Sequence, residues 1–247
     1  MKFGVADYGM NVWDGGLFDI EERLTGLLEI GYEGTERLSA VSPSDALHKA
    51  GLYRKLGAGF ATVRGPDIQS TIQWTAALGK DYVWTQVTGK DFDTFCRQVN
   101  LQVEICADWD LKVGLHNHLG SLVESQQELE EFLERCPNCG LILDTAHLAA
   151  ADGDSVGIAA GYADRCVAIH LKDWLVTNPD IGLEQWPKRG RFCELGAGNI
   201  GLDNAAVMKA LVEKGYDGWV FVEHDTHLRE PLEDLSTSRE YLRKAGF

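Results

Sequence analysis

GLILDTAH, residues 140–147, runs from an apolar segment directly into an aspartate and a histidine. Three other apolar segments end in the same way, in LHNH (115–118), IHLKD (169–173) and VEHD (222–225). The sites of parallel α/β barrels are built from residues at the carboxyl ends of their strands. These four endings therefore predict one polar site at one end of such a barrel.

Strand and helix signals alternate along the whole chain. Short apolar segments predict eight strands, at about 3–7, 33–37, 59–63, 81–87, 112–117, 140–144, 166–171 and 218–223. Apolar residues spaced by three and four predict helices between them, at about 19–28, 44–56, 92–109, 125–135, 203–214 and 232–244. Eight strand–helix units in 247 residues are typical of an α/β protein with a single (β/α)8 TIM barrel domain, residues 1–247.

A doubly wound open sheet would show the same alternation. That fold usually carries Gly-x-Gly-x-x-Gly after its first strand, whereas the first strand here is followed by DYGMN at 7–11. The segment GAGNIG at 196–201 matches the bare pattern but follows no clear strand, so we interpret it as an active-site loop. The barrel is therefore the favoured architecture.

Composition narrows the class of partner. The net charge is -15, and both nucleic acid and an anionic membrane surface require clustered Lys and Arg. No stretch of about 18 apolar residues occurs, and the N-terminus enters a strand pattern without the apolar core of a signal peptide. We expect a cytoplasmic protein that acts on a small molecule, with no nucleic acid or membrane partner.

Four residues form a candidate metal site. Asp144, His170 and Glu223 end separate strands, and Glu124 follows His116 on the next loop. Such an oxygen-rich set suits Mn2+, Mg2+ or Co2+. The competing interpretation is that each residue caps a helix or bonds a loop.

Several segments carry a resemblance to a known family. The similarity extends from GYEGTE (31–36) to SREYL (238–242) and includes DTAH (144–147), HLKD (170–173), ELGAG (194–198), and GYDGW (215–219) followed by Val222-Glu223. These segments resemble the xylose-isomerase-like barrels of the sugar phosphate isomerase/epimerase superfamily. HNHLGSLVES (116–125) looks most like the inosose (2-keto-myo-inositol) dehydratase branch.

The resemblance implies a site and a substrate class. It implies one divalent metal ion, Mn2+ first and Mg2+ or Co2+ next, held by Glu124, Asp144, His170 and Glu223. The implied substrate is a keto sugar or keto cyclitol. Barrels of this kind often pair through their mouth loops, so a homo-oligomer in contact through the long segment 174–201 is a further expectation.

One departure from the wider family concerns the fifth strand. Many related epimerases carry a glutamate there, where this chain has Leu115 or its neighbours. The departure puts a two-base epimerase mechanism in doubt. His116 and His118 alternate along the strand, so their side chains are expected on the same side, where an imidazole can transfer protons at neutral pH.

The predicted chemistry is the removal of a proton alpha to a carbonyl. A metal ion would stabilise the enediolate, and Lys172 could add positive charge beside it. The base would be Glu223 or one of His116, His118 and His147. Loss of a β-hydroxyl as water would make the enzyme a dehydratase, and return of the proton would make it an isomerase or epimerase. Elimination from an oxidised (3-keto) glycoside uses the same first step.

Further residues are candidates for substrate contacts: Glu36, Trp13, Arg64, Trp174 and His224. A salt bridge would explain Glu36 equally well, and loop packing would explain the tryptophans. The basic run KRGR at 188–191 is either a clamp for a phosphate or carboxylate, or a solvated turn.

Two other classes of protein share part of this pattern. An apurinic-site endonuclease would need more metal ligands and a basic face, which this acidic chain does not offer. A non-catalytic sugar-binding or regulatory subunit is compatible with the fold, but it gives no reason for four candidate ligands.

Overall fold

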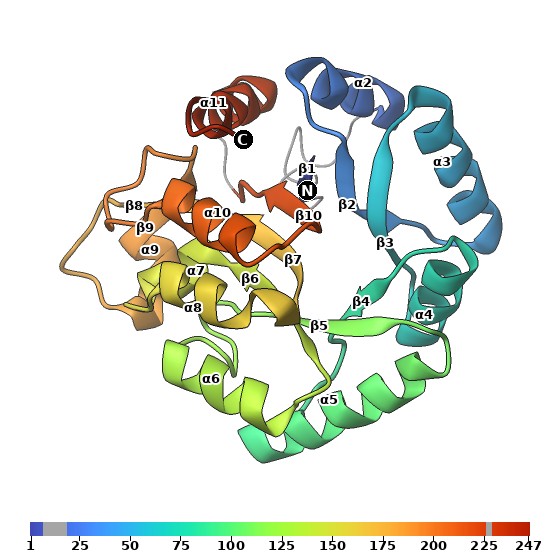
Figure 1. The fold of residues 1–247 in the computed structure, drawn as a ribbon, viewed down its shortest axis with the longest axis horizontal. Coiled ribbons are helices and arrows are strands. Elements are labelled where there is room, and N and C mark those ends of the chain that lie inside the picture. The colour runs from blue at the N-terminus through green and yellow to red at the C-terminus, as the bar shows by residue number, and fades with distance from the viewer. Residues whose placement is uncertain (7–18, 226–228) are drawn as a thin grey trace.

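The computed structural model describes residues 1–6, 19–225 and 229–247. The candidate Trp13 and the segment DYGMN lie outside the described residues. Eight parallel strands curl into a nearly closed barrel with helices around it (Figure 1). The barrel strands are β1 (Lys2–Val5), β2 (Gly34–Ser39), β3 (Gly59–Arg64), β4 (Tyr82–Trp84), β5 (Lys112–His116), β6 (Gly140–Asp144), β7 (Cys166–Leu171) and β10 (Trp219–Val222).

The strand order confirms the predicted barrel. It is β3-β2-β1-β10-β7-β6-β5-β4, and all seven hydrogen-bonded pairings are parallel. The two strands at the ends of this order, β3 and β4, form no ladder with each other. The barrel is therefore closed by hydrogen bonds everywhere except at this seam.

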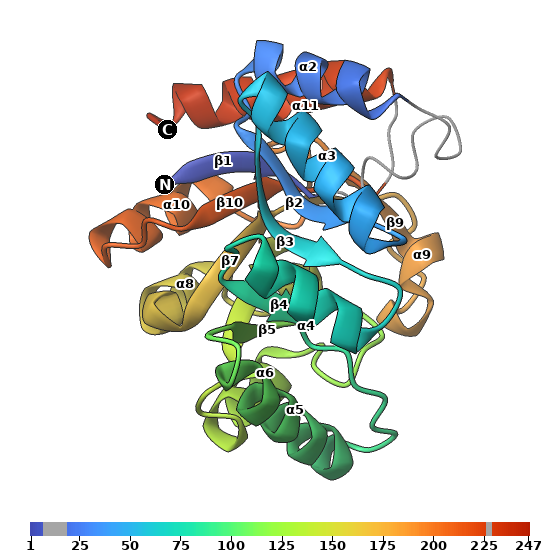
Figure 2. The ribbon, with the colours of Figure 1, turned by 90° about the vertical axis from the view of Figure 1, so that its right-hand side faces the viewer.

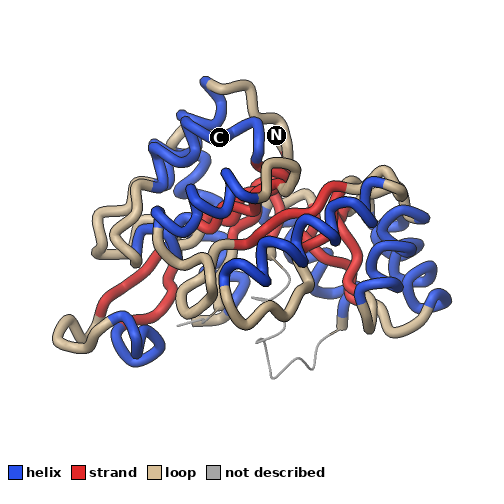
Figure 3. Tube along the Cα trace, turned by 90° about the horizontal axis from the view of Figure 1, so that it is seen from below, coloured by secondary structure: helices blue, strands red, loops and turns tan. Residues whose placement is uncertain are grey.

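The helices lie outside the strands, as Figure 3 shows in blue and red. They are α2 (Ile20–Ile30), α3 (Pro43–Leu56), α4 (Ile68–Ala77), α5 (Phe92–Ala107), α6 (Gln126–Arg135), α7 (Thr145–Ala150), α8 (Ser155–Tyr162), α9 (Trp186–Arg189), α10 (Asn204–Glu213) and α11 (Pro231–Lys244), with short 3-10 turns η2 (Ala163–Arg165) and η3 (Leu183–Gln185). All six predicted helices are present. Among the described helices, none combines the length and apolarity that a membrane span requires.

Helices α4, α7, α8 and the four-residue α9 were not predicted. The sequence of α4 is IQSTIQWTAA, whose β-branched residues lower helix propensity and hide the helical spacing. Asp67 nevertheless starts this helix by accepting a hydrogen bond from the Ser70 amide. Helix α7 has only six residues and begins directly at the end of β6, so no turn signal separates it from the strand.

An antiparallel hairpin projects from the barrel where a long loop was expected. Its strands are β8 (Asp173–Val176) and β9 (Gly190–Cys193), and η3 and α9 lie between them. The side view in Figure 2 places the chain termini at one end of the barrel and β9 with α9 at the other. The hairpin thus stands at the end where the carboxyl termini of the strands converge.

Tight packing inside the barrel demands glycine at specific positions. Phe221 lies in the interior, and a Cβ on Gly4 would approach its ring to 2.7 Å. Gly34 has a φ of 155°, and a Cβ there would lie 1.9 Å from the Gly59 carbonyl oxygen. Gly4 on β1 therefore leaves room for the Phe221 ring of β10, and Gly34 allows β2 to approach β3 at Gly59.

Candidate active site

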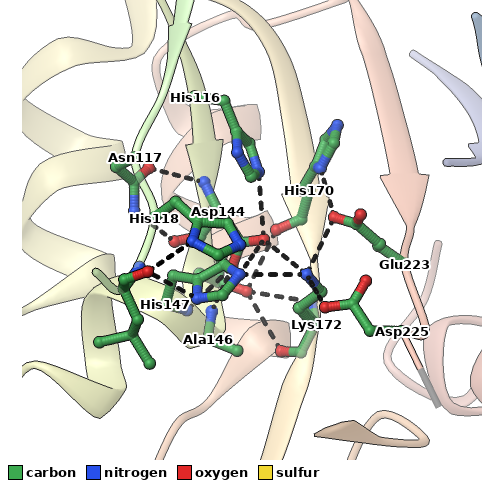
Figure 4. A network of polar contacts seen from close by, with 12 residues as sticks. His116, Asn117, His118, Asp144, Ala146, His147, His170, Lys172, Glu223 and Asp225 are labelled. Carbon is green, nitrogen blue, oxygen red and sulfur yellow. Dashed lines mark hydrogen bonds and ion pairs between the residues drawn. The ribbon is translucent and has the colours of Figure 1, made fainter. Parts of the chain in front are cut away.

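Four side chains converge at the carboxyl ends of neighbouring strands. His116 ends β5, Asp144 ends β6, His170 lies near the end of β7 and Glu223 directly follows β10. One ligand atom from each lies within 4.8 Å of the others, and the group is largely buried. Figure 4 shows these side chains pointing toward one another. Asp144, His170 and Glu223 are three of the metal ligands predicted from the sequence, and His116 is a predicted catalytic residue.

Glu124, the fourth ligand candidate from the sequence, is not brought to this group. Its carboxylate accepts a hydrogen bond from the Gly120 amide within its own loop. Its backbone amide donates to Glu128 Oε2, which belongs to the capping box of α6 with Ser125. The start of α6 thus fixes the direction of Glu124, and His116 occupies the fourth corner of the cluster.

Two buried polar atoms at the centre of the cluster form no hydrogen bond within the described part of the chain. They are His116 Nε2 and Asp144 Oδ2, which lie 3.4 Å apart. The other oxygen of this aspartate accepts hydrogen bonds from the Ala146 and His147 amides at the start of α7. The Lys172 ammonium lies 3.3 Å from Asp144 Oδ2 and compensates its charge, but neither Oδ2 nor His116 Nε2 has a hydrogen bond among the described residues, and a divalent cation would satisfy both atoms.

His170 is held between two carboxylates. Its Nδ1 lies 2.6 Å from Glu223 Oε2, and its Nε2 lies 3.0 Å from Glu36 Oε2. Glu36 also accepts hydrogen bonds from the Tyr82 hydroxyl and the Trp84 indole N–H, each 2.9 Å long. Burial lowers the pKa of His170, but the two carboxylates outweigh it and raise the pKa to about 10. Without a metal ion, this imidazole is protonated at neutral pH.

Lys172 places a buried positive charge beside the cluster. Its Nζ lies 3.3 Å from Asp144 Oδ2, 3.2 Å from Glu223 Oε2 and 2.9 Å from Asp225 Oδ2. Burial disfavours the ammonium, but these carboxylates raise the pKa of Lys172 well above its usual value. Burial raises the pKa of Asp225 to about 6, although Lys172 opposes the shift.

His118 and His147 form a second pair of imidazoles next to Lys172. Their ring centroids lie 3.7 Å apart, and His147 Nε2 is 3.3 Å from Lys172 Nζ. The Leu119 backbone amide donates to His147 Nδ1 over 3.3 Å. Burial holds the pKa of His147 well below its usual value, and it also lowers the pKa of His116. The imidazoles of His147 and His116 are therefore neutral at pH 7.

A cavity of about 650 Å³ opens onto these groups. It is lined by Arg37, Arg64, Trp84, His116, His118, Lys172, Trp174, Trp186, Pro187, Gly190, Arg191, Phe192, Glu223 and Asp225. The hairpin supplies an aromatic wall, in which Trp174 packs on Phe192 at 4.7 Å between ring centroids and on Trp186 at 5.8 Å. Apolar rings combined with a few charged groups are typical of a site for a small polyhydroxylated molecule.

The remaining candidates for substrate contacts divide into two groups. Arg64 and Trp174 line the cavity. Glu36 lies beneath it and contacts His170, and His224 turns to α11, where its Nε2 lies 3.0 Å from Ser238 Oγ. Asp225 and Phe192 also line the cavity, although neither was predicted as a site residue. In the sequence, only the position of Asp225 just after a predicted strand indicated that it could belong to the site. No feature of the sequence indicated this for Phe192.

The segment 196–201 was interpreted as an active-site loop, but it does not line the cavity. The Gly196 amide donates to Asp173 Oδ2, and the Asn199 amide donates to the Trp174 carbonyl oxygen. This segment instead supports the base of the hairpin from behind. Its glycines serve close packing: a Cβ on Gly198 would lie 1.9 Å from Asp173 Oδ1.

Comparisons with known proteins agree with this architecture. The model of a family described as xylose isomerase-like TIM barrel matches residues 62–245. The inosose dehydratase of Lactiplantibacillus plantarum is 29% identical over 180 residues, which cover 69% of this chain and 59% of that protein. The inosose dehydratase of Clostridium botulinum is 25% identical over 223 residues, 86% of this chain and 71% of that protein. The chain thus spans 59% of the length of the first relative and 71% of the length of the second.

Solved structures show the same fold. The probable 3-DHS dehydratase of Bacillus anthracis superimposes with a TM-score of 0.74 at 15% identity, covering 98% of this chain and 99% of that chain. An L-ribulose 3-epimerase gives 0.73 at 17% identity, with coverage of 99% and 94%. The IolI protein with a bound zinc atom gives 0.71 at 15% identity, with coverage of 99% and 98%.

Proposed function

The chain belongs to the family of xylose isomerase-like TIM barrels, and from this premise we propose that it is a divalent-metal-dependent dehydratase of a keto sugar or keto cyclitol. The observation that carries the proposal is the cluster of His116, Asp144, His170 and Glu223, with two of its buried atoms lacking hydrogen bonds among the described residues. Relatives named inosose dehydratase support the reaction class.

The donor set fits a divalent ion. Two imidazole nitrogens and two carboxylate oxygens suit Mn2+ or Co2+ better than Mg2+, which prefers oxygen ligands alone. We propose Mn2+ as the cofactor, held by these four residues, although the same donor set also suits Co2+ and Zn2+. When bound, the ion would polarise the substrate carbonyl and stabilise the negative charge that forms when the α-proton leaves.

Glu36 positions one of these ligands. Its contact with His170 Nε2 favours the tautomer that carries a proton on this nitrogen and leaves Nδ1 available for coordination. Hydrogen bonds from Tyr82 and Trp84 fix the carboxylate in turn. We propose that Glu36 acts through His170 and not by touching the substrate.

Proton transfer falls to His118 in this proposal. Among the candidate bases outside the metal cluster, His118 lines the cavity, whereas His147 lies behind it. His118 takes the α-proton and returns it to the β-hydroxyl, which departs as water, so the proton balance closes on one residue. The ammonium of Lys172 stabilises the adjacent negative charge.

The reaction is tested by proton NMR in D2O with Mn2+-loaded and metal-stripped protein. The substrates are 2-keto-myo-inositol, a set of ketohexoses and a 3-keto glycoside, and samples are quenched with chelator before reading. We expect metal-dependent loss of water from the cyclitol. Deuterium incorporation with interconversion of ketoses would instead identify an isomerase or epimerase, and release of an aglycone would identify glycoside elimination.

The metal site is tested separately. Asp144→Ala and His170→Ala should abolish both metal binding and activity while the far-UV circular dichroism spectrum stays native. Full activity in both variants would disprove the metal site.

Cytoplasmic location and a homo-oligomeric state, both expected from the sequence, belong to the same proposal. The six free cysteines fit a cytoplasmic location.

A further inference from the structure

A groove of about 560 Å³ lies on the outside of the barrel, between the neighbouring helices α4 and α5 (Figure 1). None of the side chains that line it carries a charge, although 25% of the residues in the chain are charged. The groove is therefore an uncharged surface on a strongly acidic protein. Its lining residues are Ile68, Gln69, Ile72, Gln73, Gln86, Val87, Thr88, Gln98, Leu101, Gln102, Ile105 and Trp109.

The groove follows from the open seam of the barrel. Strands β3 and β4 share no ladder, and each is bonded to its own helix. The Val63 amide of β3 donates to Thr75 Oγ1 of α4 over 3.3 Å. The Gln86 amide, just after β4, donates to Gln102 Oε1 of α5 over 2.9 Å. The two helices are thus fixed to different strands, and the space between them stays open.

Helix α5 exposes a line of large apolar side chains beside this groove. Leu101, Ile105 and Trp109 are 56%, 47% and 44% exposed. Their spacing of four residues places them on one face of the helix. No large apolar side chain of the segment 174–201, through which pairing was expected from the sequence, is exposed to this extent. Contiguous apolar surface of this kind marks a contact site, and it lies on α5 and not on the hairpin.

The groove also contains a buried acceptor. Gln98 lines the groove one turn before Leu101, and its Oε1 forms no hydrogen bond within the described part of the chain. A donor from a molecule docked in the groove would satisfy this oxygen.

Exposed charges of opposite sign lie toward the two ends of the same face of α5. Arg97 lies one turn before Leu101, and Asp108 lies just past the end of the helix, beside Trp109. A two-fold axis perpendicular to α5 would place a second copy of this helix antiparallel to the first and would form each contact twice. The basic end of one helix would then face the acidic end of the other.

We propose that the groove and the exposed face of α5 bind the same surface of a second copy of this chain across a two-fold axis. Leu101 lies opposite the partner's Ile105 in this pairing, and Arg97 and Gln98 lie opposite the partner's Asp108 and Trp109. Opposite charges meet at both ends of the contact, and the partner's Trp109 indole N–H reaches the Gln98 oxygen. The apolar side chains of both copies are buried between them.

Charge favours a second copy as the occupant. Two chains with a net charge of -15 repel each other, and an uncharged lining keeps this repulsion out of the contact. Glu104 approaches its own copy near the two-fold axis and opposes association, but it is exposed and screened by solvent. The pairing does not depend on the proposed reaction, because α5 contributes no residue to the substrate cavity.

Sedimentation equilibrium over a range of protein concentrations tests the pairing, without a metal ion or a substrate. We expect the average mass to rise from 27.3 kDa, the mass of one chain, toward twice that value. Leu101→Lys should keep the protein monomeric, because it places a charge in the apolar centre of the contact. Leu47→Lys is the matched control: Leu47 is 67% exposed on α3, which contributes nothing to the groove, so this variant should associate like the wild type.

Exchange of the two charges tests the antiparallel arrangement. Arg97→Glu and Asp108→Arg should each weaken association by about tenfold, because like charges then face each other at both ends of the contact. A mixture of the two variants should associate like the wild type, and so should the double variant, because each restores opposite charges. This recovery cannot come from a change in folding.

Three results would count against the pairing. A protein that stays monomeric at all concentrations would leave the groove to a small apolar ligand or to a different protein, and would overturn the proposal. A dimer that survives Leu101→Lys would place the contact on another surface. Charge variants that fail to recover on mixing would refute the antiparallel two-fold pair.

Discussion

Asp144 divides its two carboxylate oxygens between folding and the proposed chemistry. One oxygen caps α7 by accepting hydrogen bonds from two backbone amides, and the other faces the candidate metal ligands His116, His170 and Glu223. An aspartate here thus serves the local structure even without a metal ion. This dual use explains why interpretations as a helix cap and as a metal ligand both apply to the same residue.

The two roles of Asp144 can be separated by two substitutions. Asparagine retains an oxygen that can cap α7 but loses the charged ligand, whereas alanine loses both. We expect Asp144→Asn and Asp144→Ala to abolish metal binding alike, with the alanine variant less stable by about 1 kcal/mol. Urea unfolding of both metal-free variants measures the difference. Equal stability would show that the carboxylate does not matter to the start of α7.

Glu36 is predicted to control metal affinity without contacting the metal ion. Glu36→Gln should weaken Mn2+ binding by about 10- to 100-fold, because the amide no longer favours the required tautomer of His170. Calorimetric titration measures the change. Glu29→Gln, on the exposed face of α2, is the control and should leave the affinity unchanged.

Metal binding is predicted to depend steeply on pH. The pKa of His170 is raised to about 10 without metal, so a proton must leave before its nitrogen can coordinate. We expect the dissociation constant for Mn2+ to fall by about tenfold for each pH unit between 6 and 9. An affinity independent of pH over that range would contradict the protonated state of His170.

The same pKa shift has an effect on the stability of the metal-free fold. The folded pKa lies above the ordinary value of 6.5, so the stabilisation is complete below pH 6.5 and is lost as the pH rises to about 10. The carboxylates act in a different range. The pKa values of Asp144 and Glu223 are lowered despite burial, chiefly by Lys172, so their contribution disappears only as the pH falls below about 4.

At the scale of elements, a buried network connects helices to the strand that carries the site. Thr145 Oγ1 of α7 lies 2.8 Å from Asn204 Oδ1 of α10 and also accepts from the Lys172 backbone amide. Asn204 in turn donates to the Lys172 carbonyl oxygen over 2.9 Å. The network fixes the backbone at the end of β7, from which Lys172 reaches the cluster.

Loss of this network should destabilise the fold. Thr145→Val keeps the volume of the side chain but leaves the Asn204 oxygen and the Lys172 amide without a partner, at a cost of about 1–3 kcal/mol. Thr25→Val removes an exposed hydroxyl on α2 that donates to the Glu21 carbonyl, and should change stability by less than about 0.5 kcal/mol. Chemical denaturation of both variants decides whether the network matters.

The sequence predicted those elements whose pattern is local. All eight barrel strands were placed within a few residues, and most of them are short apolar runs, whereas α4 was missed because its β-branched residues resemble a strand. The hairpin was missed because Trp174 and Phe192 pair only across a long connection. The spacing of residues along the sequence does not reveal a contact between two residues so far apart.

The candidate site divides in the same way. Asp144, His170 and Glu223 could be predicted because a parallel barrel brings its strand ends together. The exchange of Glu124 for His116 in the cluster could not, because the capping box of α6 decides where the loop turns Glu124. The strand-end motifs predicted the residue types of the candidate cluster, and the turn chemistry decided which side chain reaches it.

At the scale of the whole molecule, the barrel has one weak seam. Strands β3 and β4 end the sheet order and share no ladder, whereas β6 and β7 are bonded on both sides. Edge strands open at lower free energy than central ones. We expect amide hydrogen exchange, followed by mass spectrometry, to be faster in 59–64 and 82–84 than in 140–144 and 166–171. Equal protection in all four segments would show that side-chain packing closes the seam as firmly as hydrogen bonds do.

Lys172 gives the metal-free protein a cation of its own. Its ammonium lies within 3.3 Å of Asp144, Glu223 and Asp225, so these carboxylates are compensated before any ion arrives. Uncompensated buried carboxylates would otherwise repel one another and oppose folding. Synthesis and metallation therefore need not coincide in time. Under the proposed function, folded apoprotein would persist where the divalent ion is scarce and would gain activity when the ion binds.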